Sequence, residues 1–212
     1  MGKPVKRSYD ASGRQARAQQ TRRRVIDVAH DLFIRQGYGR TTIADIARGA
    51  DVSVETVYSA FGNKAALLRK VWYVRFRGDE QDVRLLDRAE IQEMLAEPDL
   101  VVRLRRHAVV VTAVFRRFVP LHRALGAAAA SESSAAEMVA EFDAGRLDAC
   151  SQYAKAAKRT GQLAVSTAEC RDVFNATLDG SLWHRLVHEG GWSDKRFAAF
   201  LGDLWVSALT SS

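Results

Sequence analysis

Apolar residues recur at the spacing of an amphipathic α-helix along most of the chain, which predicts an all-helical protein. The first clear example runs from Val25 through Ala29 to Phe33, where apolar side chains fall three or four positions apart and so share one face of a helix. Gly37 ends this pattern, since glycine readily adopts the left-handed conformation that follows a helix. The sequence has no long alternation of apolar and polar residues and only three prolines. We therefore expect no β-sheet.

Two short helices are predicted next, with a tight turn between them. Thr42 is placed to cap the first, and Asp45 follows three positions later to complete an acidic form of the capping box. Asp51 marks the turn, because Asp tolerates a positive φ better than most residues other than Gly. Ser53 is the expected N-cap of the second helix, and Gly62 is its expected end.

Such short helices are not stable alone, so both must pack on the helix before them. Three helices with a tight turn between the last two form the helix-turn-helix pattern, in which the last helix enters the major groove of DNA. The basic, polar segment 1–17 is predicted to be a flexible arm ahead of it.

From Lys64 onward the pattern predicts a larger set of longer helices. The expected helices are 64–76, 83–96, 99–118, 120–129, 134–160, 166–188 and 194–209, with an exposed bend near 126–137. The predicted organisation is therefore a flexible basic arm (1–17), a helix-turn-helix DNA-binding domain (18–66) and a larger helical domain (67–212).

The net charge of +7 is concentrated at the N-terminus. Residues 1–24 contain eight Lys or Arg and one Asp, while the remaining 188 residues carry 24 charges of each sign. A basic segment beside a folded domain attracts polyanions, nucleic acid first and anionic membranes second. A solubilising tail is the alternative.

The sequence predicts a cytoplasmic protein without a membrane span. Its longest apolar stretch, 108–115, is far shorter than the ~20 residues needed to cross a bilayer. The N-terminus lacks the apolar centre of a signal peptide, and Cys150 and Cys170 are too few for a disulfide framework.

The third helix carries side chains suited to DNA. Thr56 is able to contact a base edge or a phosphate, Val54 to pack on a thymine methyl group, and Tyr58 to reach a phosphate oxygen. The N-termini of the two helices that begin near Thr42 and Lys64 favour anions. The predicted DNA-binding residues are Thr42, Ser53, Val54, Glu55, Thr56, Tyr58 and Lys64. Glu55 either accepts a hydrogen bond from a cytosine amino group or only favours the helix N-terminus.

Residues 18–68 resemble the N-terminal domain of the tetracycline-repressor (TetR) family of transcriptional regulators. The resemblance is carried by GYGRTTIADIARGADVSVETVYSAFGNKAALL. It implies that Thr42, Tyr58 and Lys64 contact phosphates and that Ser53–Thr56 read bases. Asp51 replaces the usual turn glycine, and Ser59 and Ala60 replace larger residues, which weakens the expected contact with each half-site and leaves more of it to the arginine-rich arm.

The C-terminal segment also resembles one branch of that family, in which a Gly-Trp-Ser turn precedes the last helix. That helix has a wide apolar stripe, formed by Phe197, Phe200, Leu201, Leu204, Trp205 and Leu209. The resemblance implies a homodimer that pairs its last two long helices in a four-helix bundle. Burial within the chain's own core is the alternative.

A mostly apolar interior with a few polar groups suits a cavity for a hydrophobic or amphipathic small molecule. Besides Tyr73 and Thr112, the predicted ligand-binding residues are Trp72, Phe76, His107, Val111, Phe115 and Tyr153. Ordinary core packing is the alternative. The resemblance implies that a ligand would tilt the helix that begins at Lys64 and lower the affinity for DNA.

We therefore predict a ligand-responsive regulator, a repressor rather than an activator, that binds palindromic operator DNA as a homodimer. No catalytic residues, metal site or cofactor are predicted, and the chain is not expected to be an enzyme. A non-specific architectural DNA-binding protein is the first alternative. A helical metal-dependent enzyme is the second, since His184 and His188 share a helix face, but no third ligand and no HExxH motif are present.

Overall fold

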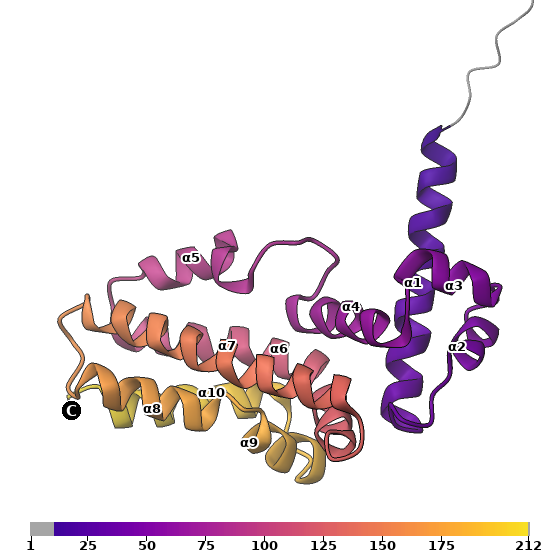
Figure 1. The fold of residues 1–212 in the computed structure, drawn as a ribbon. Coiled ribbons are helices and arrows are strands. Elements are labelled where there is room, and N and C mark those ends of the chain that lie inside the picture. The colour runs from indigo at the N-terminus through magenta and orange to yellow at the C-terminus, as the bar shows by residue number, and fades with distance from the viewer. Residues whose placement is uncertain (1–10, 212) are drawn as a thin grey trace, which may run out of the picture. The chain divides into compact units, whose positions relative to one another are not determined.

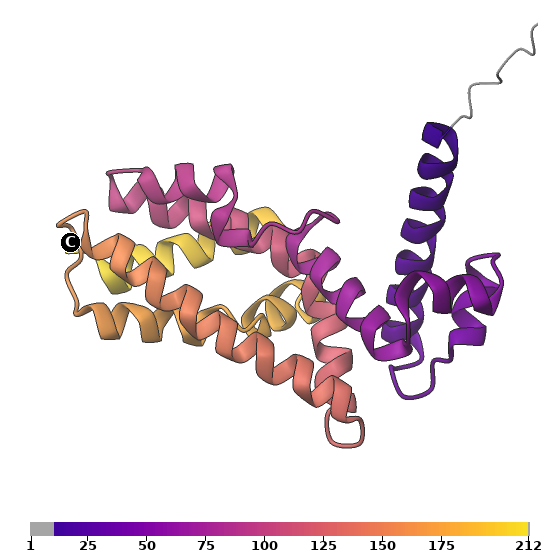
Figure 2. The same ribbon diagram turned by 45° about the horizontal axis from the view of Figure 1, so that its top comes forward.

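The computed structural model of the chain describes residues 11–211, which form two compact all-α units (Figures 1 and 2). The first unit extends to Val71 and the second begins at Trp72. The described residues contain no β-strand, only an isolated bridge between Leu163 and Thr210, so the all-helical prediction is confirmed. None of the described helices is long and apolar enough to cross a membrane.

The first unit is a three-helix head with the start of a fourth helix. Its elements are α1 (Ala11–Arg35), α2 (Ile43–Gly49), α3 (Val54–Phe61) and the first turns of α4 (Lys64–Arg77). Helix α2 packs against both α1 and α3. Apolar side chains from every helix fill one core, including Val25, Phe33, Ile46, Val57 and Leu67. The helix-turn-helix prediction therefore holds as a fold.

Helix α1 begins earlier than the sequence predicted. Residues 11–17, which were expected in a flexible arm, belong to this helix, while residues 1–10 lie outside the described residues. The segment GRQARAQQ explains the difference, because Ala, Arg and Gln all have high helix propensity and only Gly13 opposes it. The basic segment is thus partly helical.

The second unit is a bundle of longer helices. Its elements are the rest of α4, η1 (Leu85–Asp87), α5 (Ala89–Ala96), α6 (Leu100–Ala128), α7 (Ser133–Lys158), α8 (Thr167–Thr177), α9 (Ser181–Trp183), the π-helix η2 (His184–Glu189) and α10 (Asp194–Leu209). Helix α6 packs against α7 and α10, and α7 packs against α8, so these four run alongside one another (Figures 1 and 2).

Helix α6 is continuous where the sequence predicted two helices. The expected break at Pro120 is wrong, because Pro120 lies inside a 29-residue helix. A proline in a helix interior lacks the N–H that would bond to the carbonyl four residues earlier. Buried side chains on both sides of it, among them Phe118, Val119 and Leu121, hold the two halves in register. Tertiary packing therefore outweighs the local cost.

The single helix predicted over 166–188 is instead interrupted after Thr177. Gly180 has a φ of +83°, in the left-handed region, and a Cβ atom there would lie 2.5 Å from Cγ2 of Val119. This close approach to α6 requires glycine. The chain then continues as the short helix α9 and the π-helix η2 before α10.

Candidate nucleic-acid interface and ligand cavity

Helix α3 has one buried face and one exposed face. Val57 is 1% exposed and Phe61 is also buried, and together they anchor the helix in the core of the first unit. Tyr58 is 50% exposed although it follows Val57 directly, because successive residues of a helix point about 100° apart. Ser53, Glu55 and Thr56 are exposed and Val54 is half-buried. The predicted reading residues therefore share an accessible surface.

Local hydrogen bonds fix the start of α3. The Ser53 side chain accepts a hydrogen bond from the Thr56 N–H at 3.1 Å, and its Oγ lies 3.1 Å from Thr56 Oγ1. The turn before it places Asp51 at a φ of +52°, the only non-glycine residue with a positive φ within residues 11–211. The turn and cap predicted at these positions are both present.

Thr42 forms the predicted capping box with Asp45. Its side chain accepts a hydrogen bond from the Asp45 N–H at 3.1 Å, and Asp45 Oδ2 accepts from the Thr42 N–H at 3.2 Å. The Asp45 carboxylate also lies 3.1 Å from Arg48 Nη1. Hydrogen bonds from Thr42, and then the charge of Arg48, lower the pKa of Asp45, so the box is ionised at neutral pH.

Glu55 is held by the helix on which it lies. Hydrogen bonds from its own backbone N–H and then from the Ser53 hydroxyl lower the pKa of Glu55. A carboxylate in the first turn also interacts favourably with the helix dipole. This geometry gives Glu55 a local stabilising role, and its contact with a cytosine amino group stays a prediction.

Lys64 lies at the start of α4 and contacts the loop between α1 and α2. Its ammonium donates a hydrogen bond to the Gly39 carbonyl at 3.3 Å and lies 4.2 Å from the centroid of the Tyr38 ring. Asn63 Oδ1 accepts from the Ala66 N–H at 2.8 Å, so one of the N–H groups expected to bind an anion is already bonded. Lys64 remains half-buried.

Helix α1 adds a basic surface beside α3. Arg22 joins the two helices, because its Nη1 donates to the Ala60 carbonyl at 2.8 Å and its guanidinium lies 4.5 Å from the centroid of the Phe61 ring. A shallow surface groove runs between Thr21 on α1 and Thr56 on α3. Further exposed arginines along α1 are Arg14, Arg17, Arg23 and Arg24.

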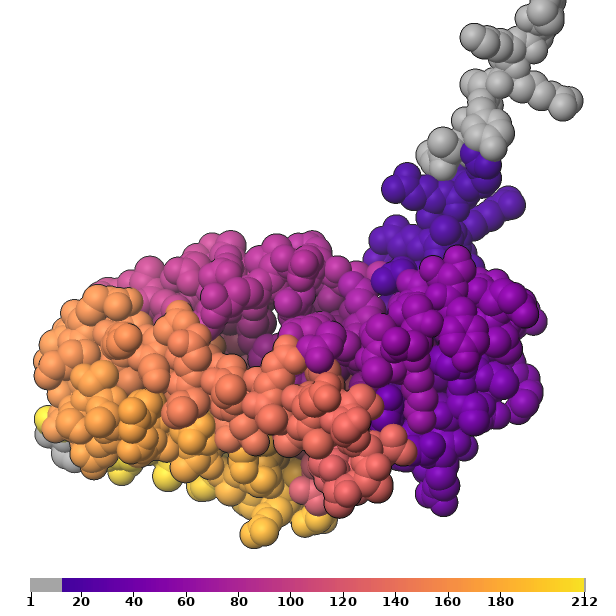
Figure 3. Space-filling model, in the orientation of Figure 1, coloured from indigo at the N-terminus to yellow at the C-terminus, as the bar shows by residue number. Residues whose placement is uncertain are grey.

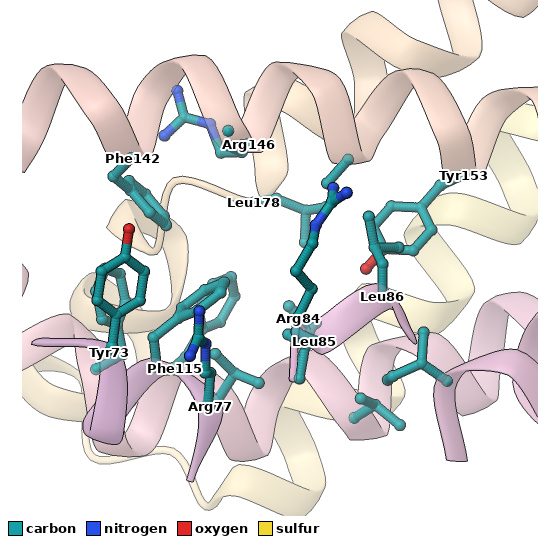
Figure 4. Close-up of a pocket in the computed structure, with 18 of the residues that line it drawn as sticks. Tyr73, Arg77, Arg84, Leu85, Leu86, Phe115, Phe142, Arg146, Tyr153 and Leu178 are labelled. Atoms are coloured by element: carbon teal, nitrogen blue, oxygen red, sulfur yellow. The ribbon is translucent and has the colours of Figure 1, made fainter. Parts of the chain in front are cut away.

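The second unit contains a cavity of about 400 Å³ (Figure 4). The molecular surface is hollowed between the segment before α5 and helix α7 (Figure 3). All six predicted ligand-binding residues lie on the cavity wall, namely Trp72, Phe76, His107, Val111, Phe115 and Tyr153. Tyr73 lines the cavity as well, whereas Thr112 does not, since its hydroxyl donates to the Ala108 carbonyl at 2.6 Å.

Aromatic rings form one end of the cavity. Trp72 on α4 lies 4.9 Å from Phe118 on α6 and 5.5 Å from Phe142 on α7, measured between ring centroids, and Phe118 and Phe142 are 4.8 Å apart. Phe118 and Phe142 were not predicted as lining residues. Phe118 lies three residues after Phe115, so helical periodicity could have placed it on the same face, whereas Phe142 comes from α7 and reaches the cavity only through packing.

Three arginines near the cavity were also missed, and each has an acidic partner. Arg77 Nη1 lies 2.7 Å from Asp82 Oδ1, and Arg84 Nη2 lies 3.6 Å from Asp148 Oδ2. Arg146 Nη1 lies 3.1 Å from an oxygen of Asp143, its neighbour one turn away on α7. The Tyr73 hydroxyl donates to Glu141 Oε1 near the same end.

His107 and Tyr153 lie together in a different part of the cavity. Their ring centroids are 4.3 Å apart, and Trp205 and Phe174 lie 5.1 Å and 5.5 Å from His107. His107 is 5% exposed and Tyr153 is 8% exposed. Burial lowers the pKa of His107 to about 3 and raises that of Tyr153, so both are uncharged at neutral pH.

The apolar stripe of α10 divides into buried and exposed positions. Phe197, Leu201, Trp205 and Leu209 are fully buried, and Trp205 Nε1 donates to Thr177 Oγ1 at 2.9 Å. The exposed positions are Phe200, at 39%, and Leu204, at 37%.

The histidine pair considered as a metal site lies in the π-helix η2. The rings of His184 and His188 stack with centroids 4.8 Å apart, and His184 Nε2 lies 3.2 Å from Glu189 Oε1. Within the part of the chain that the structure describes, no cluster of three or more metal-binding side chains is present.

Comparison with known proteins links the first unit to bacterial regulators. Residues 25–71 match the family described as bacterial regulatory proteins, tetR family. The chain is 44% identical over 52 residues to the transcriptional regulator TtgR of Pseudomonas putida, covering 24% of this chain and 25% of TtgR. It is 38% identical over 55 residues to AcrR of Shigella flexneri, covering 26% of each. The matched segment thus spans about a quarter of these relatives.

Solved structures resemble the chain over most of its length. SmeT, solved in complex with triclosan, has a TM-score of 0.67 at 21% identity, covering 91% of this chain and 93% of SmeT. The hemolysin II transcriptional regulator HlyIIR has a TM-score of 0.61 at 18% identity, covering 92% of this chain and 99% of HlyIIR. These similarities establish the fold of both units. The related proteins are regulators rather than enzymes, as the sequence predicted for this chain.

Proposed function

We propose that this chain, which belongs to the TetR family of bacterial regulatory proteins, binds double-stranded operator DNA through α3 and regulates transcription in response to a small molecule. The observation that carries the proposal is the exposed polar face of α3, a helix whose opposite face is buried in the core of the first unit through Val57 and Phe61. A short helix presented in this way fits the major groove. As a DNA-binding regulator the protein would act in the cytoplasm.

Each DNA contact follows from side-chain chemistry. Thr42, Tyr58 and Lys64 are proposed to contact phosphates, which position the protein but do not read sequence. Ser53, Val54, Glu55 and Thr56 are proposed to meet base edges. The exposed arginines of α1 lie on the helix that packs beside α3, so they would add salt-dependent affinity for the backbone.

A homodimer is proposed, with each subunit reading one half of a palindromic operator. Phe200 and Leu204 are two large apolar side chains, one turn apart on α10, that the chain's own core leaves exposed. A second copy would remove this surface from water. The half-site centres would then be about one helical turn, ~34–36 Å, or a multiple of it apart.

The effector is proposed to be a small hydrophobic or amphipathic molecule that binds the cavity and releases a repressor from DNA. A volume of about 400 Å³ falls in the range of small-molecule sites. SmeT, which shares the fold, was solved with the small molecule triclosan, and this supports a small-molecule effector. Helix α4 runs from Lys64 in the first unit to Trp72 and Phe76 on the cavity wall, so a ligand that shifts α4 would change the population of the DNA-binding state.

Electrophoretic shift of the DNA that flanks the gene tests the proposal. A specific regulator should remain bound to the flanking DNA when excess random DNA is added as competitor and the salt concentration is raised from about 50 to 200 mM. Base contacts persist under these conditions, whereas phosphate contacts weaken. A non-specific architectural DNA-binding protein is the second candidate, which the basic segment favours. Its complexes with flanking DNA and with random DNA would be lost in parallel as the salt concentration rises. A ligand that releases the DNA would identify the effector class.

A further inference from the structure

We propose that the effector is an uncharged amphipathic molecule whose hydroxyl group forms hydrogen bonds with His107 and Tyr153. This inference rests on the proposed role of the cavity as the effector site. The aromatic end of the cavity would hold the apolar body of the molecule, and the paired polar rings would hold its hydroxyl.

The first observation is that these two polar side chains are buried on the cavity wall without protein partners. Both are more than nine-tenths buried and both line the cavity. Within residues 11–211, neither side chain forms a hydrogen bond, although their rings are 4.3 Å apart between centroids. Tyr153 projects from α7 with its hydroxyl toward Leu86, on the cavity wall (Figure 4). Buried polar groups normally have partners, so a ligand is the partner that this geometry lacks.

The second observation is the protonation state of the pair. The neighbours of His107 are the rings of Tyr153, Phe174 and Trp205, and burial among them lowers the pKa of His107 to about 3. A neutral imidazole has one donor and one acceptor, and a phenol has both capacities. A hydroxyl group also donates and accepts, so it is able to bond to both residues at once. A carboxylate would lose its hydration there without gaining a cation.

The third observation is that the arginines near the cavity already have carboxylate partners, so they do not require an anionic ligand. Arg77, Arg84 and Arg146 each already lie within 3.6 Å of a carboxylate oxygen, those of Asp82, Asp148 and Asp143 respectively. A ligand carboxylate would compete with these pairs rather than fill an empty position. The Arg84 side chain is also largely exposed to solvent, which weakens its attraction for a charge.

Three biphenyl compounds with one varied group test this inference by equilibrium dialysis against the full-length protein. The compounds are 4-phenylphenol, 4-methylbiphenyl and biphenyl-4-carboxylate, which share an apolar body and differ in the polar end. The phenol should bind about tenfold more tightly than the methyl compound, the size expected for well-formed buried hydrogen bonds. The carboxylate should bind most weakly.

Matched variants assign the effect to the two residues. Tyr153→Phe removes only a hydroxyl, and His107→Phe keeps an aromatic ring, so each should reduce the preference for the phenol several-fold while leaving 4-methylbiphenyl binding unchanged. Tyr38→Phe is the control, because Tyr38 lies in the first unit and is not on the cavity wall. It should leave the preference intact.

The outcomes separate this inference from the proposed function. An unchanged preference for the phenol in both variants overturns the inference, as does tightest binding of the carboxylate or equal binding of all three compounds. In those last two cases the cavity still binds small molecules, so the proposed function stands. Failure of all three compounds to bind contradicts the inference and the effector role of the cavity together, while DNA binding is measured independently.

Discussion

At the scale of single residues, neighbouring side chains on α3 have opposite roles. Val57 is buried and fixes the helix, while Tyr58 is half-exposed and is available to a partner. This division could be predicted from sequence, because helical periodicity determines which side chains share a face. The hydrogen bond that Glu55 accepts from Ser53 could not be predicted, since it depends on the conformation of the cap.

Asp51 offers a direct test of the turn. Its φ of +52° is unfavourable for a residue with a side chain, although Asp tolerates it better than most. Asp51→Gly should raise the free energy of unfolding by about 0.5–1 kcal/mol, measured by urea denaturation. Asp51→Val is the opposing control and should destabilise the protein, since β-branched residues disfavour this conformation. Lower stability for the glycine variant would contradict the role given to this turn.

Because His107 is buried, we expect the free energy of unfolding to depend on pH. Burial lowers the pKa of His107 from an ordinary value of 6.5 to about 3 in the folded protein. Between these two pH values the unfolded chain therefore binds a proton that the folded protein does not. The stabilising contribution is present above pH 6.5 and is lost as the pH falls toward 3. Between about pH 6 and 4, the wild type should lose about 1.4 kcal/mol more per pH unit than His107→Phe.

Urea denaturation of both proteins at several values across that pH range measures this difference. The buried histidine is the only change between them, so the other histidines contribute equally to both slopes. Parallel slopes would show that His107 takes up a proton in the folded protein.

At the scale of elements, the sequence predicts helices well where caps and glycines mark their ends. Thr42 and Ser53 cap α2 and α3 as predicted, and Gly62 ends α3. Prediction failed where tertiary contacts override local signals. Helix α6 continues through Pro120, and the helix expected over 166–188 breaks where Gly180 approaches Val119. Neither outcome is visible without the packing partner.

Pro120 is expected to destabilise helix α6. In a helix interior, proline is about 3 kcal/mol less favourable than alanine, and here it leaves the Arg116 carbonyl without its usual donor. Pro120→Ala should therefore raise the free energy of unfolding by about 1–3 kcal/mol, as measured by urea denaturation. Ala113→Gly, at an exposed position of the same helix, should lower it by about 1 kcal/mol. A loss of stability in Pro120→Ala would show that α6 needs the proline.

The cavity shows how far a site could be predicted from sequence. His107, Val111 and Phe115 are four residues apart on one helix, so helical periodicity alone places them on one face. Phe142 and Arg84 lie on other segments, where no periodicity relates them to these three residues, and only packing brings them to the same cavity.

At the scale of the whole molecule, the proposed regulator needs two subunits to read a palindrome. Each charge placed on the exposed apolar face of α10 would oppose burial of that face in an interface. Leu204→Glu should therefore shift the protein from dimer to monomer in sedimentation velocity, without changing its helical content. Leu147→Glu introduces the same charge on an exposed position of α7 and should leave the dimer intact. A dimer unaffected by Leu204→Glu would place the interface elsewhere.

Fluorescence anisotropy of labelled flanking DNA measures whether the exposed face of α3 reads operator DNA. Affinities are measured at about 150 mM salt for the wild type, Tyr58→Phe and the double variant Thr56→Ala/Tyr58→Phe, each against a scrambled duplex. We expect Tyr58→Phe to bind both duplexes several-fold more weakly than the wild type. The double variant should also lose most of its preference for the flanking DNA, so that the ratio of its two affinities falls by about tenfold or more. Wild-type affinity and preference in the double variant would show that this face of α3 does not read the DNA.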